Sequence, residues 1–329
     1  KLSRHTMKLE PAQQAQSQKQ QKTTTAVSSK HHRKQTSQST PCKLGAYRIE
    51  QRMANGAFGR VYRCSSTHHA LTHSSFAMKL FEKKRTNRQH YETEIEILSS
   101  LPTHPNVVSL VEVVEDDDFV AIVLPYFESG SLLQFIRDFG VENMTELHVK
   151  AFIDQILKGL QFLHQQGVIH GDIKASNVLI GDDGVAKLAD FGISRHVFHE
   201  KTESKRTEGG DEQKDQHMRK QTDFIGSPYW MAPELIEMEP MTPACDIWAV
   251  GVVCIELFTG YPPYAELDPF GALFRIVQDS HPPLPEEIGE LFCNFLMRCF
   301  AKNPLHRSSA KRLLRHKWLT ELEEHIWWD

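Results

Sequence analysis

The strongest constraint on the fold is the run HGDIKASNVLIGDDGVAKLADFG at residues 170–192. Asp172, Lys174 and Asn177 stand together near its beginning, and Asp190 stands near its end. Between them, two short apolar stretches flank an Asp-Asp-Gly sequence, which is a turn signal for a β-hairpin. A hairpin returns Asp190 to the loop that holds Asn177. The chain is therefore expected to fold so that these four polar residues lie close together.

This grouping of side chains suits phosphoryl transfer to a hydroxyl group. Asp172 can accept the proton of a substrate hydroxyl and orient it, while Lys174 can stabilise the transferred phosphoryl group. Asn177 and Asp190 offer one neutral and one charged oxygen to Mg²⁺, which prefers few carboxylates together with phosphate oxygens. Taken alone, the loop is also compatible with an ordinary turn.

A second indication lies upstream, in the glycine-containing stretch MANGAFGRVYRC at residues 53–64. Gly56 and Gly59 lack a Cβ atom, so main-chain N–H groups there can approach phosphate oxygens closely. Val61 follows on an apparent strand. A lone glycine-rich turn is about as typical of a simple hairpin as of a nucleotide site, so this stretch gains meaning only from its neighbours.

A lysine ends the next apolar strand, FAMK, at Lys79, eighteen residues after Val61. If this strand faces inward, the buried ammonium group requires a partner. Glu94, in the helix predicted around residues 91–101, is the candidate. An ion pair between the two would hold the ammonium group toward the α and β phosphates of a nucleotide, although each residue alone also fits a surface charge.

Taken in order, these pieces resemble the signature set of eukaryotic protein kinases. The set comprises GAFGRV, AMK, Glu94, HGDIKASN, DFG and the APE sequence at residues 232–234. The resemblance covers about residues 47–319, more than four-fifths of the chain. It implies an enzyme that uses ATP as co-substrate and Mg²⁺ as cofactor.

The resemblance also implies an α+β, bilobal protein kinase fold. The kinase domain is expected at residues 47–319, followed by a short C-terminal end at 320–329. Its N-lobe, about residues 47–126, is small and β-rich with one regulatory helix. Its C-lobe, about residues 127–319, is larger and helical, in agreement with an i, i+3, i+4 apolar stripe over residues 149–163.

The resemblance assigns individual roles within these lobes. Asp172 and Lys174 are the expected catalytic residues, and Asn177 and Asp190 the expected magnesium ligands. The expected ATP-binding residues are Met53, Ala54, Asn55, Gly56, Ala57, Phe58, Gly59, Arg60, Val61, Ala77, Lys79, Glu94, Pro125, Phe127 and Leu179. Scaffold roles are expected for Asp246 beneath residues 170–177, called here the catalytic loop, for an Arg307–Glu234 pair, and for a stack of His170, Phe191 and Leu98.

Other stretches narrow the resemblance. GSPYWMAPE and HGDIKASNVLI resemble the sterile-type Ser/Thr kinases that feed MAP kinase cascades, and Lys174 also favours a Ser/Thr kinase over a tyrosine kinase. Residues 267–304 are similar to plant epsilon-type MAP kinase kinase kinases and to fungal kinases that start septation and mitotic exit. The implied partners are proteins that bear Ser or Thr, downstream kinases among them.

Two positions depart from the kinase pattern. Ala54 stands where the first loop glycine belongs, and Gly171 replaces an Arg that clasps a phosphorylated activation loop in many relatives. Every residue expected to do chemistry is nevertheless present. An active enzyme with altered switching is therefore the preferred interpretation, and a catalytically silent scaffold that acts by binding proteins is the alternative.

Two segments have low-complexity composition. Residues 1–46 carry nine Lys/Arg and one Glu, and they are expected to form a disordered basic tail rich in Gln, Ser, Thr and Lys. Its basic charge suits an anionic partner such as a nucleic acid, but a solubilising tail without a partner is the preferred interpretation. Residues 199–222 balance six acids with six bases and are expected to form a mobile insertion in the activation loop. Thr222 and Ser227 are the candidate phosphosites.

The cysteines and the apolar runs indicate the compartment. Six Cys occur without a C-x-x-C pair, which favours a reducing environment over a disulfide framework. The longest strongly apolar stretch, residues 247–255, is too short to span a bilayer. A cytoplasmic protein without a membrane span is therefore expected.

The substitution Ala54→Gly tests whether the first departure is functional. Ala tolerates an extended backbone, and Gly mainly adds conformational entropy to the unfolded chain. We therefore expect the Michaelis constant for ATP to change by less than about threefold in steady-state kinetics. A tenfold improvement would show that Ala54 is a functional defect.

Overall fold

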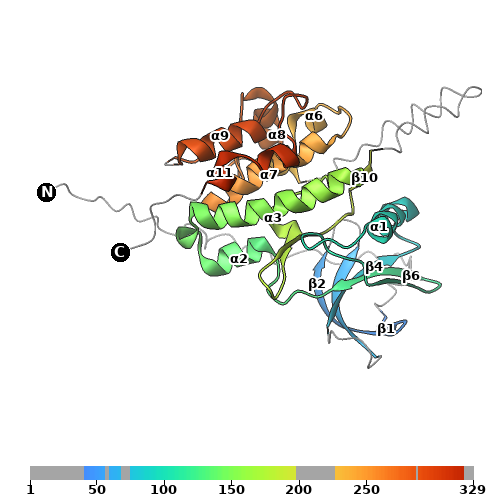
Figure 1. Cartoon of the computed structure of the whole chain (residues 1–329). Helices are drawn as coiled ribbons and strands as arrows, with labels where there is room; N and C mark the ends of the chain where they lie inside the picture. Colours follow the sequence, from blue (N-terminus) through green and yellow to red (C-terminus); the bar gives the residue numbers. More distant parts are fainter. Residues whose placement is uncertain (1–40, 56–58, 68–74, 198–226, 287, 322–329) are drawn as a thin grey trace, which may run out of the picture. The chain divides into compact units, whose positions relative to one another are not determined.

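The computed structural model describes residues 41–55, 59–67, 75–197, 227–286 and 288–321 (Figure 1). All of these residues belong to one compact unit. Its N-terminal part is an antiparallel sheet in the order β1-β2-β3-β4-β6-β5. The strands are β1 (Lys43–Leu44), β2 (Tyr47–Asn55), β3 (Arg60–Ser66), β4 (Phe76–Glu82), β5 (Glu112–Glu115) and β6 (Phe119–Pro125).

The first strand corrects the expected boundary of the tail. β1 lies within residues 1–46, which the composition assigned to a disordered segment. Leu44 is nevertheless buried, and β1 pairs with the start of β2 through Lys43↔Arg48 and Leu44↔Tyr47. A strand of two residues with one apolar side chain leaves almost no periodic signal, which is why composition alone missed it.

One helix, α1 (Arg88–Ser100), accompanies this sheet. It begins at Arg88, three residues before the predicted start, because Asn87 caps it: the Asn87 side chain accepts a hydrogen bond from the Gln89 N–H at 3.1 Å. Tyr91, Glu94, Ile97 and Leu98 form its buried face. The helix thereby directs Glu94 inward together with its apolar neighbours.

The C-terminal part is mostly helical (Figure 1). Its helices are α2 (Leu132–Phe139), α3 (Glu146–Gln165), α6 (Pro233–Ile236), α7 (Pro243–Thr259), α8 (Pro269–Gln278), α9 (Glu290–Cys299), α10 (Ala310–Leu313) and α11 (Lys317–Thr320). The predicted apolar stripe forms the buried face of α3. The α+β kinase fold predicted from the sequence, a small sheet with a helix followed by a helical part, is confirmed.

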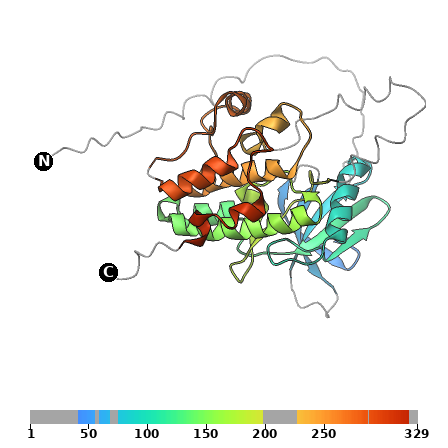
Figure 2. The ribbon, with the colours of Figure 1, turned by 45° about the horizontal axis from the view of Figure 1, so that its top comes forward.

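Helix α7 lies at the centre of this part, beside α3 in both views (Figures 1 and 2). Thirteen of its seventeen residues are buried, on every side of the helix. Thr242 caps its N-terminus, and Gly260 ends it in the left-handed conformation at φ 83°. Among the described residues, no helix combines the length and the apolar character needed to cross a membrane.

Four short strands form two further ladders. The predicted hairpin is present as β8 (Val178–Ile180) and β9 (Ala186–Leu188), which pair through Val178↔Leu188 and Ile180↔Ala186. β7 (Val168–Ile169) pairs with β10 (Arg195–His196). The β7–β10 ladder joins the two ends of the segment that carries Asp172, Asn177 and Asp190. The β8–β9 hairpin lies within this segment.

A buried ion pair ties α6 to the chain between α9 and α10. Arg307 donates to both carboxylate oxygens of Glu234, at 2.6 and 2.9 Å. Its side chain also donates to three main-chain carbonyl groups. The two side chains are essentially inaccessible to solvent, so each charge depends on the other for compensation.

The substitution Glu234→Gln is expected to lower the free energy of unfolding by roughly 3–5 kcal/mol, because it leaves the Arg307 charge buried without its counterion. Urea unfolding measures this loss. The matched control is Asp154→Asn, which removes the exposed Asp154–Lys158 pair and should cost below about 0.5 kcal/mol. Equal losses in the two variants would contradict a structural role for the buried pair.

Candidate active site

Three charged side chains meet where the sheet faces the C-terminal part. The Lys79 ammonium group lies 2.7 and 2.8 Å from the two carboxylate oxygens of Glu94. It also lies 2.7 Å from Asp190 Oδ1. The predicted Lys79–Glu94 pair is therefore present, and it includes Asp190, which the hairpin β8–β9 delivers to the same place.

Burial and the neighbouring charges together set the protonation states of Lys79 and Asp190. Burial alone would lower the pKa of Lys79, but the charges of Glu94 and Asp190 raise it above the usual value. Burial of Asp190 opposes its ionisation, and the Lys79 charge nevertheless lowers the pKa of its carboxyl group. Lys79 is therefore a cation and Asp190 an anion at neutral pH. Asp190 also has a left-handed backbone, at φ 65°, which is a strained conformation for a non-glycine residue.

Below the triad, one buried carboxylate holds the backbone of the catalytic loop. Asp246 accepts the main-chain N–H groups of His170 at 3.0 Å and Gly171 at 2.8 Å. The His164 ring lies 2.8 Å from the same carboxylate. Burial would raise the pKa of Asp246, but these contacts lower it, so the carboxylate stays ionised. The bracing role expected for Asp246 matches this geometry.

The conformation of Gly171 gives the second sequence departure a structural meaning. Its φ of +81° lies in the region that favours glycine. A Cβ atom there would also stand 3.2 Å from Met241 Cε. Gly171 thus lets the loop adopt this turn without backbone strain. Any residue with a Cβ atom at this position would have a strained backbone.

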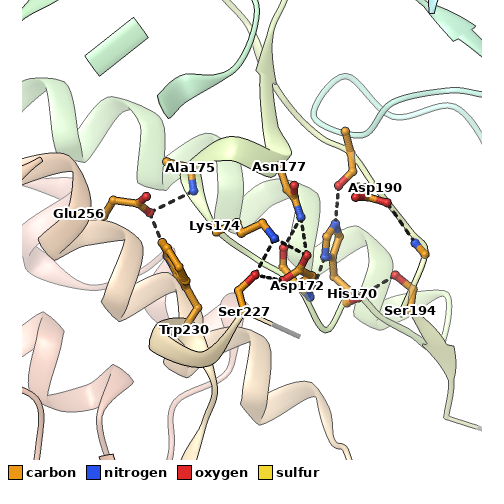
Figure 3. Close-up of polar contacts among 12 residues, drawn as sticks. His170, Asp172, Lys174, Ala175, Asn177, Asp190, Ser194, Ser227, Trp230 and Glu256 are labelled. Atoms are coloured by element: carbon orange, nitrogen blue, oxygen red, sulfur yellow. Dashed lines mark hydrogen bonds and ion pairs between the residues drawn. The ribbon is translucent and has the colours of Figure 1, made fainter. Parts of the chain in front are cut away.

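Beyond Gly171, the candidate catalytic residues form one hydrogen-bonded group (Figure 3). Lys174 Nζ lies 2.7 Å from Asp172 Oδ2 and 2.6 Å from Ser227 Oγ. Ser227 Oγ donates to Asp172 Oδ1 at 3.0 Å. The Asn177 amide donates to the main-chain and side-chain oxygens of Asp172, at 2.9 and 2.8 Å. The loop and a residue more than fifty positions away thereby orient a single carboxylate.

The side chains of Asn177 and Asp190 fit a magnesium ion. The Asn177 amide nitrogen is directed at Asp172, and Asp190 uses Oδ1 for Lys79 and Gly192. Within the described ranges, Asn177 Oδ1 and Asp190 Oδ2 accept no hydrogen bond from the protein. The same ranges contain no cluster of three or more metal-binding His, Cys, Asp or Glu side chains. One amide oxygen and one carboxylate oxygen agree with the preference of Mg²⁺ for few protein ligands together with phosphate and water oxygens.

The expected nucleotide-binding positions are only partly within the described ranges. Gly56, Ala57 and Phe58 lie outside them, as does Thr222. Of the other positions of the loop, Met53, Ala54 and Asn55 stand on β2 and Arg60 and Val61 on β3, where Ala54 pairs with Val61. Gly59 packs so closely that a Cβ atom would lie 2.9 Å from the Phe81 ring, so Gly is needed here for packing.

The adjoining strands place the remaining expected ATP residues. Val61 stands opposite Lys79 across β3 and β4, and Ala77 stands opposite Leu124 across β4 and β6. Pro125 ends β6, and its missing N–H leaves only its carbonyl group for a ligand. Leu179, on β8, forms an isolated bridge with Ser131. Phe127 accepts a hydrogen bond from Gly130 N–H.

The expected stack between the lobes is present in part. The rings of His170 and Phe191 lie with their centroids 5.1 Å apart. Leu98 is buried in the same hydrophobic cluster as Phe191. His170 is fixed further by a 3.0 Å contact between Nε2 and the Ala189 carbonyl oxygen. The residue before Asp190 is thereby held directly by the residue at the start of the catalytic loop.

Sequence reasoning missed a second buried carboxylate in the site, Glu256 on α7 (Figure 3). It accepts the main-chain N–H of Ala175 at 3.1 Å and the Trp230 indole N–H at 2.9 Å. Glu256 therefore connects the catalytic loop to the segment that follows Ser227. The available signal was a Glu inside the apolar run AVGVVCIELF, because a buried acid needs partners.

A family model described as the protein kinase domain matches residues 47–319. The chain belongs to the protein kinase family. A probable serine/threonine-protein kinase of Dictyostelium discoideum is 39% identical over 298 residues, which cover 89% of the chain and 43% of that protein. Cytokinesis protein sepH of Emericella nidulans is 39% identical over 284 residues, which cover 86% of the chain and 20% of that protein.

A plant kinase shows the same degree of similarity. MAP3K epsilon protein kinase 1 of Arabidopsis thaliana is 36% identical over 297 residues, which cover 89% of the chain and 20% of that protein. The kinase chain thus spans about one fifth to two fifths of the length of these relatives. The expected resemblance to protein kinases, and to the epsilon-type and septation kinases among them, is confirmed.

The pH dependence of stability tests the environment of Glu256 in this kinase. Burial raises the pKa of Glu256 from 4.5 to about 6. The folded state then holds its proton to higher pH than the unfolded chain, so its contribution is full below pH 4.5 and is lost as the pH rises through 6. Relative to Glu256→Gln, the wild type should lose ~2 kcal/mol of unfolding free energy between pH 4.5 and 7.

Urea unfolding of both proteins at several pH values measures this difference. Glu266→Gln, which neutralises an exposed acid, is the control for a change of net charge. A stability difference between wild type and Glu256→Gln that stays constant from pH 5 to 8 would contradict the assignment.

Proposed function

We propose that the chain transfers the γ-phosphate of ATP to Ser or Thr hydroxyl groups of other proteins. The observation that carries the proposal is the joint arrangement of two groups of residues. Lys79, Glu94 and Asp190 form one charged triad, and Asp172 and Lys174 form an ion pair in the adjoining loop. Such a site acts mainly by positioning and by electrostatic stabilisation, as phosphoryl transfer requires.

Within this proposal, the nucleotide binds between the sheet and the catalytic loop. Val61, Ala77 and Leu179 contact the adenine ring, while main-chain groups near Pro125 and Phe127 bind its polar edge. Lys79, held by Glu94, binds the α and β phosphates. Asn177 and Asp190 hold Mg²⁺, which neutralises phosphate charge during transfer.

Asp172 orients the attacking hydroxyl group and accepts its proton. Its carboxylate is already fixed by Lys174, Asn177 and the Ser227 hydroxyl. Lys174 can turn toward the transferred phosphoryl group and stabilise its charge. The contacts of Ser227 with Asp172 and Lys174 give Ser227 a positioning role. A phosphate on Ser227 would place further negative charge beside Asp172. The prediction of Ser227 and Thr222 as phosphosites remains a prediction.

The finer placement of the kinase is part of the proposal. Similarity to a MAP3K epsilon kinase and to a cytokinesis protein supports a signalling kinase in a MAP kinase cascade or in the control of septation and mitotic exit. All six cysteines are free, which supports action in the reducing cytoplasm. We assign the kinase domain to residues 47–319, with β1 (Lys43–Leu44) added to the edge of its sheet, the activation-loop insertion at 199–222 and a basic tail before β1.

A silent scaffold with the kinase fold is the second candidate function. It would bind partners through the helical part and would not need an assembled triad. The bidentate contact between Lys79 and Glu94, with Asp190 at 2.7 Å, favours the enzyme. Transfer of radiolabelled γ-phosphate to a generic basic protein, myelin basic protein, in the presence of Mg²⁺ separates the two candidates.

The substitution Asp172→Asn is expected to lower kcat by roughly two to four orders of magnitude with a modest change in ATP affinity, as for loss of a general base. Lys79→Met should also strongly lower the rate of phosphoryl transfer. Asp182→Asn, at an exposed acid in the turn between β8 and β9, is the matched control and should leave kcat unchanged. A kcat of the Asp172→Asn variant close to that of the wild type would contradict the assignment of Asp172 as the general base.

A further inference from the structure

An exposed aromatic pair lies on the outer face of α8. Phe270 and Phe274, one helical turn apart, are 79% and 65% exposed. The opposite face of the helix is filled by Ala272, Leu273 and Ile276, which are buried. The fold therefore does not need the two aromatic rings, and such pairs on an otherwise soluble surface mark interaction sites.

Helix α8 is connected to the catalytic group through one short segment. Its N-terminal region packs on the 3₁₀ turn Pro228–Trp230. The Tyr229 hydroxyl donates to the carbonyl oxygen of Leu267, at 2.9 Å, just before the α8 cap. The same segment begins at Ser227, which donates to Asp172. Helix α8 therefore connects a molecule bound on its outer face to the segment that borders the acceptor site.

The surroundings of the aromatic pair are acidic. Glu237 and Glu266 are exposed, and Glu237 lies close enough to Lys302 to interact with it electrostatically. Lys302 itself binds the carbonyl oxygens at the C-terminal end of α8, at 2.6 Å. The exposed base on the helix, Arg275, is paired with Asp279 at 2.9 Å. The charge that a partner meets here is therefore predominantly negative.

Next to the helix, the surface is also hollowed. Glu266 borders a pocket of about 490 Å³ whose other walls include Tyr261, Pro263 and Leu284. Figures 1 and 2 show α8 on the side of α7 away from α3. The helix that carries the aromatic pair thus lies outside the packed pair of helices α3 and α7.

We propose that Phe270, Phe274, Glu237 and Glu266 form a docking surface for protein substrates, called here the α8 surface. It takes a segment in which apolar side chains are flanked by Lys or Arg. The apolar side chains cover the two rings, and the basic residues meet the acidic rim. The proposal rests on the proposed Ser/Thr kinase function, and it separates recognition of the substrate protein from chemistry on its hydroxyl group.

The test compares one acceptor sequence in two contexts. Myelin basic protein is phosphorylated, its acceptor position is mapped by mass spectrometry, and a 15-residue peptide around that position is made. For the double variant Phe270→Ser/Phe274→Ser, KM for the whole protein should rise at least about tenfold, or ~1.4 kcal/mol, with kcat within about twofold. KM and kcat for the peptide should stay within about twofold of wild type.

Two matched controls accompany this variant. Leu305→Ser alters an apolar side chain that is 89% exposed outside the α8 surface, and it should change neither KM. Glu237→Lys/Glu266→Lys should raise KM for the whole protein at low salt, and the increase should shrink as salt screens it. Asp117→Lys, in the turn between β5 and β6, is the charge-reversal control and should have no such effect.

Each contrary outcome has one meaning. Equal changes for the protein and the peptide, or no change for either, would overturn the docking surface. A dimer in sedimentation that the serine substitutions abolish would identify a second copy as the occupant and would also overturn it. Failure of the unmodified chain to phosphorylate either substrate would instead overturn the proposed function.

Discussion

The rest of the site depends on the hydrogen bonds between the buried carboxylate of Asp246 and the main chain of the catalytic loop. This carboxylate holds two consecutive amides of the catalytic loop, and it belongs to α7, a helix buried on every side. Ten residues later on the same helix, Glu256 holds Ala175 at the far end of the loop and Trp230 in the segment after Ser227. One rigid helix thereby sets the positions of Asp172 and of the surface that a substrate approaches.

The second organising contact joins the two parts of the domain. Lys79 comes from β4, Glu94 from α1 and Asp190 from the loop after β9, and their oxygens surround one ammonium group. This contact is costly to bury unless all partners are present. It therefore couples the position of α1 to that of Asp190, and with it the nucleotide site to the catalytic loop.

Local signals predicted much of this arrangement, and tertiary contacts explain the rest. The hairpin that returns Asp190 follows from apolar stretches around a turn sequence, and the Lys79–Glu94 pair follows from the need to compensate a buried charge. The first residues of α1 were missed because an Asn cap extends the helix before its apolar face begins. The contact between Ser227 and Asp172 could not be predicted, because no spacing relates residues so far apart in the chain.

The attachment of the catalytic loop to Asp246 has a consequence for how the loop moves. The main-chain N–H groups of His170 and Gly171 both donate to a carboxylate inside the core, so their hydrogens exchange with water only when these bonds to α7 open. Irregular loops ordinarily exchange fast. Here deuterium should enter the start of the loop about as slowly as it enters α7. The start of the catalytic loop and α7 thus open as one unit, the most protected of the domain.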